Sequence, residues 1–368
     1  MSTRRINLNQ LTVLIILYLI GGTAIANVGK HSSQDIWVVI LISSILGGGL
    51  LILYHRLSQL NEYKGLPEIF RACLGKGLGT WVIIIYASFF LLRIFLLATS
   101  LAEMAQLTLM YGESQKVILA VLLITVVYCS LYGINAIGRS AEIFFGVIIL
   151  CLIPFFISVF SNGLFKYDNL IPIFAVGTIK IRQDIFRTFL FPFGELILFL
   201  MLFQFIPKKE SHKILKRSCI ALFIGTLIIV LIEVMNLALL GSDLVTNFKY
   251  PFYNAMQLAT LRGLIDRLDP LAIIIIIISG YFKLVLYFYA GTITIQSLNK
   301  KFKYKWVLLI VALGIFFVAP YIEYDKTNFL VSTLPYKIMT FIELGIPILL
   351  WLISEVKNYQ QTKKTQVI

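Results

Sequence analysis

The sequence is poor in charge, cysteine and histidine, and these shortages exclude several classes of protein. Charged residues make up 14% of the 368 residues. The four cysteines are scattered without C-x-x-C spacing and the three histidines lie far apart, so neither a disulfide framework nor a zinc site is expected. No H-E-x-x-H, G-x-S-x-G or phosphate-binding glycine loop occurs. We therefore expect no metal, no cofactor and no enzymatic activity.

Long apolar runs are what the sequence has in abundance. Hydrophobic residues make up 59% of the chain, whereas soluble domains have about 45–50% apolar residues. A run of about 20 apolar residues spans the hydrocarbon core of a bilayer. The first run is that long and ends without a small-residue cleavage site, so we expect no cleaved signal peptide. The pattern predicts an all-α integral membrane protein with one permease-like domain over 1–368 and ten transmembrane helices, at 8–28, 36–56, 79–109, 114–134, 141–160, 183–206, 214–240, 270–298, 306–323 and 333–354.

Basic residues outnumber acidic residues, 32 to 18, which gives a formal net charge of +14. With the N-terminus placed in the cytoplasm, most lysines and arginines fall in cytoplasmic loops and at cytoplasmic ends of spans. This is the usual bias of membrane proteins. The charge therefore indicates a topology with both termini cytoplasmic, and it gives no reason to expect a nucleic-acid partner.

Two of the predicted spans contain residues that continue a helix poorly. The first span contains Gly21-Gly22-Thr23, and the sixth contains Phe191-Pro192-Phe193-Gly194-Glu195. Backbone groups freed at the middle of a membrane are tolerated only where they line a cavity or meet a ligand. Matching interruptions in two halves of a chain are typical of a transporter binding site.

The loop lengths also divide the chain into two corresponding halves. Five spans per half make the second half enter the membrane from the opposite side. A long connection follows the second span, at 57–78, and another follows the seventh, at 241–269. We therefore expect an inverted repeat, with halves at about 8–160 and 183–354.

Several short motifs follow one another in an order that is fairly specific as a set. They are Leu8-Asn9-Gln10, Ile20-Gly21-Gly22-Thr23-Ala24, Gln34-Asp35-Ile36-Trp37, Phe191-Pro192-Phe193-Gly194-Glu195, Phe199-Leu200-Met201-Leu202-Phe203, Pro207-Lys208, Ile265-Asp266-Arg267-Leu268-Asp269-Pro270 and Gly280-Tyr281-Phe282-Lys283. The set resembles the B-subunit family of spore germinant receptors, which belongs to the amino acid–polyamine–organocation superfamily of permeases. One departure is Ala26-Asn27-Val28, where many relatives have a proline soon after the glycines.

The resemblance implies a fold, a location and partners. The fold is of the LeuT type, with ten spans and discontinuous helices 1 and 6. The location is the inner membrane of a bacterial endospore. The partners are a larger A-type membrane subunit and a C-type lipoprotein, and the implied role is to sense a nutrient, often an amino acid, that triggers germination.

The residues at the two interruptions are the candidate ligand-binding site. If the chain unwinds at Gly21, Gly22 and Thr23, the half-helix that follows offers free N–H groups to a substrate carboxylate. The alternative is that these glycines only let two helices pack closely. Phe191 and Phe193 are expected to cover a bound side chain, while Pro192 and Gly194 loosen the backbone. Glu195 is expected to bind a substrate ammonium, carry a proton, cap a half-helix or pair with a basic residue.

Lys283 lies well inside the predicted eighth span. In the LeuT-type arrangement, spans one and eight together hold a coupling sodium ion. One hypothesis is that the Lys283 ammonium stands in for that cation and bridges the carbonyls of span one to span eight. The alternative is a simple ion pair with Glu195 or Glu233.

Three functions are compatible with these residues. The first is a germinant-sensing subunit with a permease fold, and the second is a proton-coupled secondary transporter of amino acids or similar small solutes. The third is an assembly subunit that has lost its ligand. The abundance of phenylalanine and the scarcity of intramembrane charge favour a small, neutral amino acid as ligand.

Overall fold

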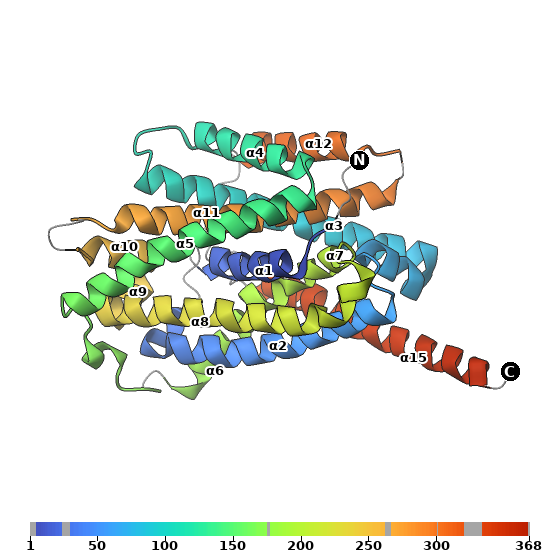
Figure 1. Ribbon diagram of the computed structural model, residues 1–368, viewed down its shortest axis with the longest axis horizontal. Coiled ribbons are helices and arrows are strands. Elements are labelled where there is room, and N and C mark those ends of the chain that lie inside the picture. The colour runs from blue at the N-terminus through green and yellow to red at the C-terminus, as the bar shows by residue number, and fades with distance from the viewer. Residues whose placement is uncertain are drawn as a thin grey trace.

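The chain folds into a bundle of helices with its first helix running through the middle (Figure 1). The computed structural model describes residues 5–23, 30–174, 177–261, 266–299, 301–319 and 333–366. The helical elements are α1 (Leu8–Thr23), η1 (Lys30–Asp35), α2 (Ile36–Leu60), α3 (Leu66–Thr108), α4 (Gln115–Leu131), α5 (Ile134–Ser161), η2 (Tyr167–Leu170), α6 (Thr178–Thr188), η3 (Phe189–Phe193), η4 (Gly194–Phe199), α7 (Leu200–Phe203), η5 (Lys208–Lys213), α8 (Ile214–Leu240), α9 (Ser242–Asn247), α10 (Pro251–Leu258), α11 (Asp269–Leu298), α12 (Tyr304–Val318), α14 (Thr333–Thr340), η7 (Phe341–Gly345) and α15 (Ile346–Gln366).

The expected spans all overlap apolar helices. Within the described residues, seven helices are long and apolar enough to cross a membrane, and α1, α4 and α12 are shorter apolar helices. This confirms an all-helical, multi-pass membrane protein. A helix of 16 residues, such as α1, is ~24 Å long, less than the ~30 Å hydrocarbon core. The count of ten spans and the inverted repeat therefore stay predictions, and the end of the ninth expected span, at 320–323, lies outside the described residues.

The connection predicted at 57–78 is largely helical rather than a loop. Leu66 already begins α3, and Gly75, with φ +79°, interrupts that helix before the membrane-spanning part. A positive φ is adopted readily by glycine and rarely by other residues, so this residue allows the change of direction. The second long connection holds two short helices, α9 and α10.

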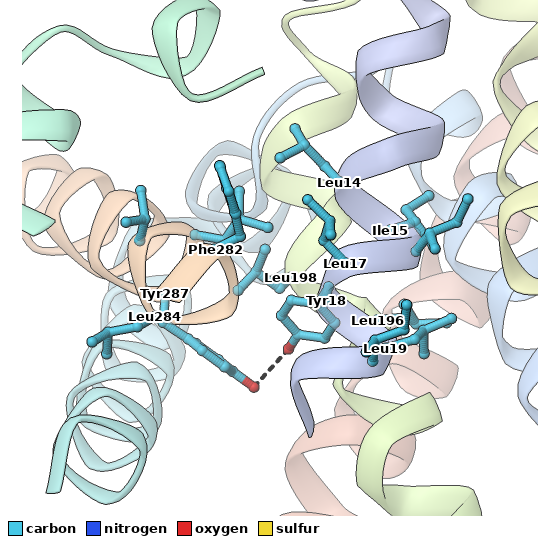
Figure 2. Close-up of a cluster of buried hydrophobic side chains, with 14 of the residues drawn as sticks. Leu14, Ile15, Leu17, Tyr18, Leu19, Leu196, Leu198, Phe282, Leu284 and Tyr287 are labelled. Atoms are coloured by element: carbon cyan, nitrogen blue, oxygen red, sulfur yellow. Dashed lines mark hydrogen bonds between the residues drawn. The ribbon is translucent and has the colours of Figure 1, made fainter. Parts of the chain in front are cut away.

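Helix α1 is buried on all sides. It packs against α8, α11 and α5, and its apolar side chains from Leu14 to Ile20 are between 0% and 2% exposed. Figure 2 shows side chains of α1 packed together with Phe282, Leu284 and Tyr287 of α11 and with Leu196 and Leu198 of the interrupted sixth span. Because α1 is apolar around its whole circumference, it suits a central position in a membrane bundle.

The first predicted interruption, at Gly21, Gly22 and Thr23, coincides with the end of α1 in the described part of the chain. All three residues are helical and buried within α1, which ends at Thr23. A Cβ on Gly21 would overlap the backbone carbonyl of Ser279, so Gly21 allows α1 and α11 to approach closely. The half-helix expected after this point, including Ala26-Asn27-Val28, lies outside the described residues.

The interruption of the sixth predicted span is present. Helix α6 is followed by a π-helical turn, η3, then by the 3₁₀ turn η4 and the short helix α7. Phe191 leaves helical geometry, with φ −124° and ψ 114°. Pro192 has no N–H to donate to the preceding turn. Helix 6 is therefore discontinuous, as expected.

The close approach at Gly21 predicts a loss of stability on substitution. In Gly21→Ala, the added methyl group pushes α1 away from the Ser279 backbone, and overpacking of this kind costs about 1–3 kcal/mol. The matched control is Gly49→Ala, because a Cβ there meets nothing within 4 Å and alanine favours a helix by about 1 kcal/mol over glycine. We expect a lower thermal unfolding midpoint in detergent for Gly21→Ala and an unchanged or higher one for Gly49→Ala. Equal midpoints for the two variants would contradict the packing role.

Candidate functional site

The irregular sixth span leaves carbonyl groups that tyrosine hydroxyls satisfy. The Tyr54 hydroxyl lies 3.1 Å from the carbonyl oxygen of Gly194. The Tyr18 hydroxyl lies 3.2 Å from the carbonyl oxygen of Glu195 and 2.7 Å from the Tyr287 hydroxyl. All three tyrosines are fully buried. In a membrane interior each unsatisfied backbone group costs several kcal/mol, so these tyrosines stabilise the interrupted backbone.

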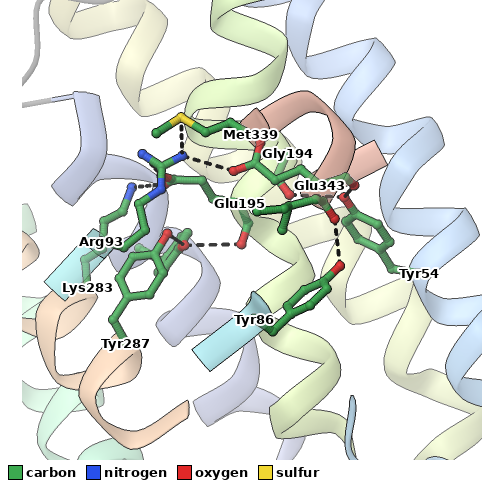
Figure 3. A network of polar contacts seen from close by, with 11 residues as sticks. Tyr54, Tyr86, Arg93, Gly194, Glu195, Lys283, Tyr287, Met339 and Glu343 are labelled. Atoms are coloured by element: carbon green, nitrogen blue, oxygen red, sulfur yellow. Dashed lines mark hydrogen bonds and ion pairs between the residues drawn. The ribbon is translucent and has the colours of Figure 1, made fainter. Parts of the chain in front are cut away.

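The Glu195 carboxylate lies between two basic side chains. Its Oε1 atom is 2.8 Å from Arg93 Nη1, and its Oε2 atom is 2.5 Å from Lys283 Nζ. Arg93 comes from α3 and Lys283 from α11, so one carboxylate joins three parts of the bundle (Figure 3). Of the roles considered for Glu195, the structure shows the pairing with basic residues. For Lys283 it shows the ion pair with Glu195.

Arg93 also contacts a second carboxylate. Its Nη2 atom lies 3.0 Å from Glu343 Oε1 and 3.6 Å from Met339 Sδ. Glu343 sits in η7, a second π-helical turn within the last predicted span. The carbonyl oxygens of η7 again accept from tyrosines, because the Tyr86 hydroxyl lies 2.6 Å from Ile342 O and the Tyr54 hydroxyl 2.5 Å from Glu343 O. The Tyr54 hydroxyl therefore lies between the two irregular segments, and its single proton is donated to one of these two carbonyl oxygens at a time.

The four side chains form one chain of alternating charge, Lys283–Glu195–Arg93–Glu343, which we call the charge chain. Two positive and two negative groups give no net charge, and each side chain is at most 5% exposed. Glu343 Oε2 is buried with no hydrogen-bond partner in the described part of the protein. It lies beside Gly194, where a Cβ would come within 2.7 Å of it. A buried carboxylate oxygen in this state favours a hydrogen-bond donor, such as a group of a ligand.

Lys283 is enclosed by α1 and by aromatic rings. A Cβ on Gly22 would lie 2.6 Å from Lys283 Nζ, so the absence of a side chain at Gly22 leaves room for the ammonium. The ammonium lies 4.5 Å from the ring centroids of both Tyr18 and Phe191. The negative faces of such rings stabilise a cation, the more so where water is excluded. The Lys283 ammonium is thus placed at the end of α1, facing the interruption.

The structure brings together most, but not all, of the candidate residues. Gly22, Phe191, Pro192, Gly194, Glu195 and Lys283 lie around the charge chain. Phe193 instead packs against Gly47 of α2, and Gly21 packs against α11. The Thr23 hydroxyl bonds back to the carbonyls of Leu19 and Ile20 within α1. These last three residues shape the surroundings of the site and do not line the charge chain.

Sequence reasoning missed the partner of Arg93. The nearest acidic residue on the same helix, Glu103, pairs with Lys249 instead. A lone arginine within an apolar span was the available signal, because such a residue needs a carboxylate from another span. The tyrosines at positions 18, 54 and 86 carried no comparable signal, since tyrosine is common in this chain.

Other buried polar groups lie apart from the charge chain. Glu233 accepts a hydrogen bond from Asn236 on its own helix, α8, so it is not the partner of Lys283. Gln10 of α1 reaches Glu142 of α5 at 3.3 Å. Within the described ranges, no group of three or more His, Cys, Asp or Glu side chains is placed to hold a metal ion.

The bridging position of Arg93 predicts that its replacement strongly lowers stability and that a second substitution, at Glu343, recovers part of the loss. Arg93→Met removes the cation between Glu195 and Glu343, and breaking a buried ion pair costs about 3–5 kcal/mol. Glu195 keeps its ion pair with Lys283 in this variant, so the uncompensated charge is that of Glu343. Adding Glu343→Gln removes that charge and should recover part of the loss. We expect the double variant to unfold at a higher temperature than Arg93→Met alone. A double variant that is less stable than Arg93→Met would rule out the bridge.

Comparisons with known proteins agree with this geometry. A family model described as spore germination protein matches residues 5–329. Spore germination protein KB of Bacillus subtilis (strain 168) is 27% identical over 99% of this chain and 98% of its own length. Spore germination protein YndE of the same organism is 23% identical over 81% of this chain and 82% of its own.

Solved structures with the same fold are membrane transporters. Mhp1, a nucleobase-cation-symport-1 family transporter, has a TM-score of 0.68 at 13% identity and is matched over 95% of this chain and 78% of its own. A manganese transporter of Eremococcus coleocola has a TM-score of 0.65 at 15% identity, over 94% of this chain and 76% of its own. Both comparisons show a LeuT-type transporter fold. The chain belongs to the spore germination protein family, the B-subunit family of germinant receptors, and it has the fold of LeuT-type transporters.

Proposed function

We propose that this protein binds a small nutrient, most simply a neutral amino acid, and that binding signals germination. The observation that carries the proposal is the charge chain beside the interrupted helix of a transporter fold. In the same proposal, the protein sits in the inner membrane of the spore with both termini cytoplasmic. It acts with an A-type membrane subunit and a C-type lipoprotein.

A zwitterion is the ligand that the charge chain can accept without a change in net charge. Its carboxylate would take the place of Glu195 on Lys283, and its ammonium would take the place of Lys283 on Glu195. Glu343 Oε2, buried without a partner among the described residues, offers a further acceptor for the ammonium. The rings of Phe191 and Tyr18 already flank this position and would cover an apolar side chain. Such an exchange replaces buried ion pairs one for one and leaves no bare charge in the membrane.

Lys283 has a second proposed role as a fixed cation. Its ammonium lies against Gly22 of α1 and against Glu195, so it links the first helix to the eighth predicted span without a bound metal ion. A substrate carboxylate would also meet free N–H groups if a half-helix begins after Thr23, a segment outside the described residues. Binding then favours one arrangement of the bundle only if the ligand binds that arrangement more tightly.

Proton-coupled transport of a small solute is the alternative function. The solved relatives of this fold are transporters, and protonation of Glu195 or Glu343 would release Arg93 or Lys283 as effectively as a ligand would. Uptake into proteoliposomes driven by a pH gradient distinguishes the two functions. A sensor binds the ligand without accumulating it, whereas a transporter accumulates it.

The decisive measurement is a thermal-shift screen of the purified protein against amino acids, sugars and nucleosides. A ligand at 100 times its dissociation constant stabilises a protein by about 2.7 kcal/mol, so we expect a clear rise in the unfolding midpoint with at least one amino acid. A protein that responds to none of the panel would be an assembly subunit rather than a sensor.

Lys283→Met should abolish that response while the protein still inserts and folds. Arg93 continues to pair with Glu195 in this variant, so the bundle stays assembled, but no ammonium remains to hold a substrate carboxylate. The matched control is Lys216→Met, because Lys216 is exposed on α8. A normal ligand response in Lys283→Met would remove Lys283 from the site.

A further inference from the structure

An apolar groove lies on the outer side of the bundle, and no residue of the charge chain lines it. It is a groove of about 800 Å³ between α3, α11 and α12. Leu91 and Phe95 line it from α3, Ile295 from α11, and Val311 and Gly314 from α12. The other lining side chains are also apolar, so the lining contains no polar side chain that could hydrogen-bond a polar nutrient.

The groove faces the surroundings of the bundle. Helix α12 lies at the edge of the molecule beside α4 (Figure 1). Its residues Ile310, Leu313 and Phe317 are 67%, 54% and 63% exposed. Large apolar side chains at that exposure are stable in a membrane protein only against lipid or another protein. The groove is therefore open to the hydrocarbon of the bilayer.

One end of the groove is marked by positive charge. Phe302, in the connection between α11 and α12, lines the groove. The exposed lysines Lys301, Lys303 and Lys305 lie within three positions of Phe302 in the sequence. Trp306, which is 63% exposed, is the next residue after Lys305. Lysines beside the membrane attract anionic lipid headgroups, and tryptophan favours the interface between headgroups and hydrocarbon.

The dimensions of the groove fit a lipid chain. Its α12 lining runs from Val307 to Val318, a distance of ~16 Å at 1.5 Å per residue. This is about half of the ~30 Å hydrocarbon core, the depth of one leaflet.

We propose that this groove binds an acyl chain of an anionic phospholipid, whose phosphate is held by Lys301, Lys303 and Lys305. The chain lies along α12, and the headgroup lies in the leaflet that the connection between α11 and α12 faces. Anionic headgroup and apolar chain are both required, because the groove supplies an apolar wall and the lysines supply the charge. This site is separate from the proposed nutrient site.

Gly314→Phe tests the chain-binding part of the proposal. A Cβ at Gly314 meets nothing within 4 Å, so a larger side chain fills the groove without displacing neighbours. Gly146→Phe on α5 is the matched control, because Gly146 is also helical, exposed and open. Native mass spectrometry of the purified full-length protein would measure retention of dioleoyl phosphatidylglycerol in detergent. We expect Gly314→Phe to lower the apparent affinity for dioleoyl phosphatidylglycerol about tenfold or more, and Gly146→Phe to leave it unchanged. Gly314→Leu serves as a milder variant if Gly314→Phe lowers expression.

Replacing Lys301, Lys303 and Lys305 together by glutamine tests the headgroup part. We expect phosphatidylglycerol to lose about tenfold or more in affinity and to bind no better than dioleoyl phosphatidylcholine. The control replaces Lys208, Lys209 and Lys213, which are exposed in a different connection. Equal lipid retention by wild type, Gly314→Phe and the 301/303/305 variant would overturn the proposal. The same holds if Gly314→Phe only weakens copurification with a partner subunit, since the groove would then be a protein interface.

Discussion

The buried guanidinium of Arg93 is the interaction on which the centre of this protein depends. It binds carboxylates from two segments that lie far apart in the sequence, Glu195 and Glu343. Both carboxylates come from helices that are irregular at that point. Without the guanidinium, the two carboxylates would share only the Lys283 ammonium, which pairs with Glu195, and one negative charge would be left unpaired in an apolar interior, where the penalty is large. The irregular helices and the arginine are therefore mutually dependent.

Tyrosine hydroxyls play the complementary part for the backbone. The sixth and last predicted spans leave α-helical geometry at one point each. There, the hydroxyls of Tyr18, Tyr54 and Tyr86 contact buried carbonyl oxygens of the irregular segments. A tyrosine can do this without a charge, because its ring is apolar and its hydroxyl donates one hydrogen bond. The irregular backbone of these two spans is thus stabilised by hydrogen bonds from uncharged tyrosine side chains.

Much of this arrangement could be predicted from the sequence, and the reasons for the remainder are specific. The apolar runs predicted the helices, and Pro192 and Gly194 predicted the interruption beside Glu195, because these residue types act locally on the backbone. The sequence left two roles open for Gly21, since a glycine that permits close packing and one that permits unwinding look alike in a sequence, and the structure shows the close packing. Arg93 and Glu343 are 250 positions apart in the sequence, and no local sequence pattern predicts an ion pair between residues so widely separated. The roles of the candidate residues in ligand binding stay predictions.

Helix α1 differs from its neighbours in having no charged side chain between Leu8 and Thr23. It meets the charge chain through Tyr18, whose hydroxyl contacts the Glu195 carbonyl and whose ring lies 4.5 Å from the Lys283 ammonium, and through the bare backbone at Gly22. A rocking motion of this helix would exchange these contacts and some apolar packing, yet would leave all three ion pairs of the charge chain in place. Moving α3, α11 or the sixth span would separate at least one of them. The first helix can consequently shift beside the charge chain without breaking an ion pair within it, which these three elements cannot.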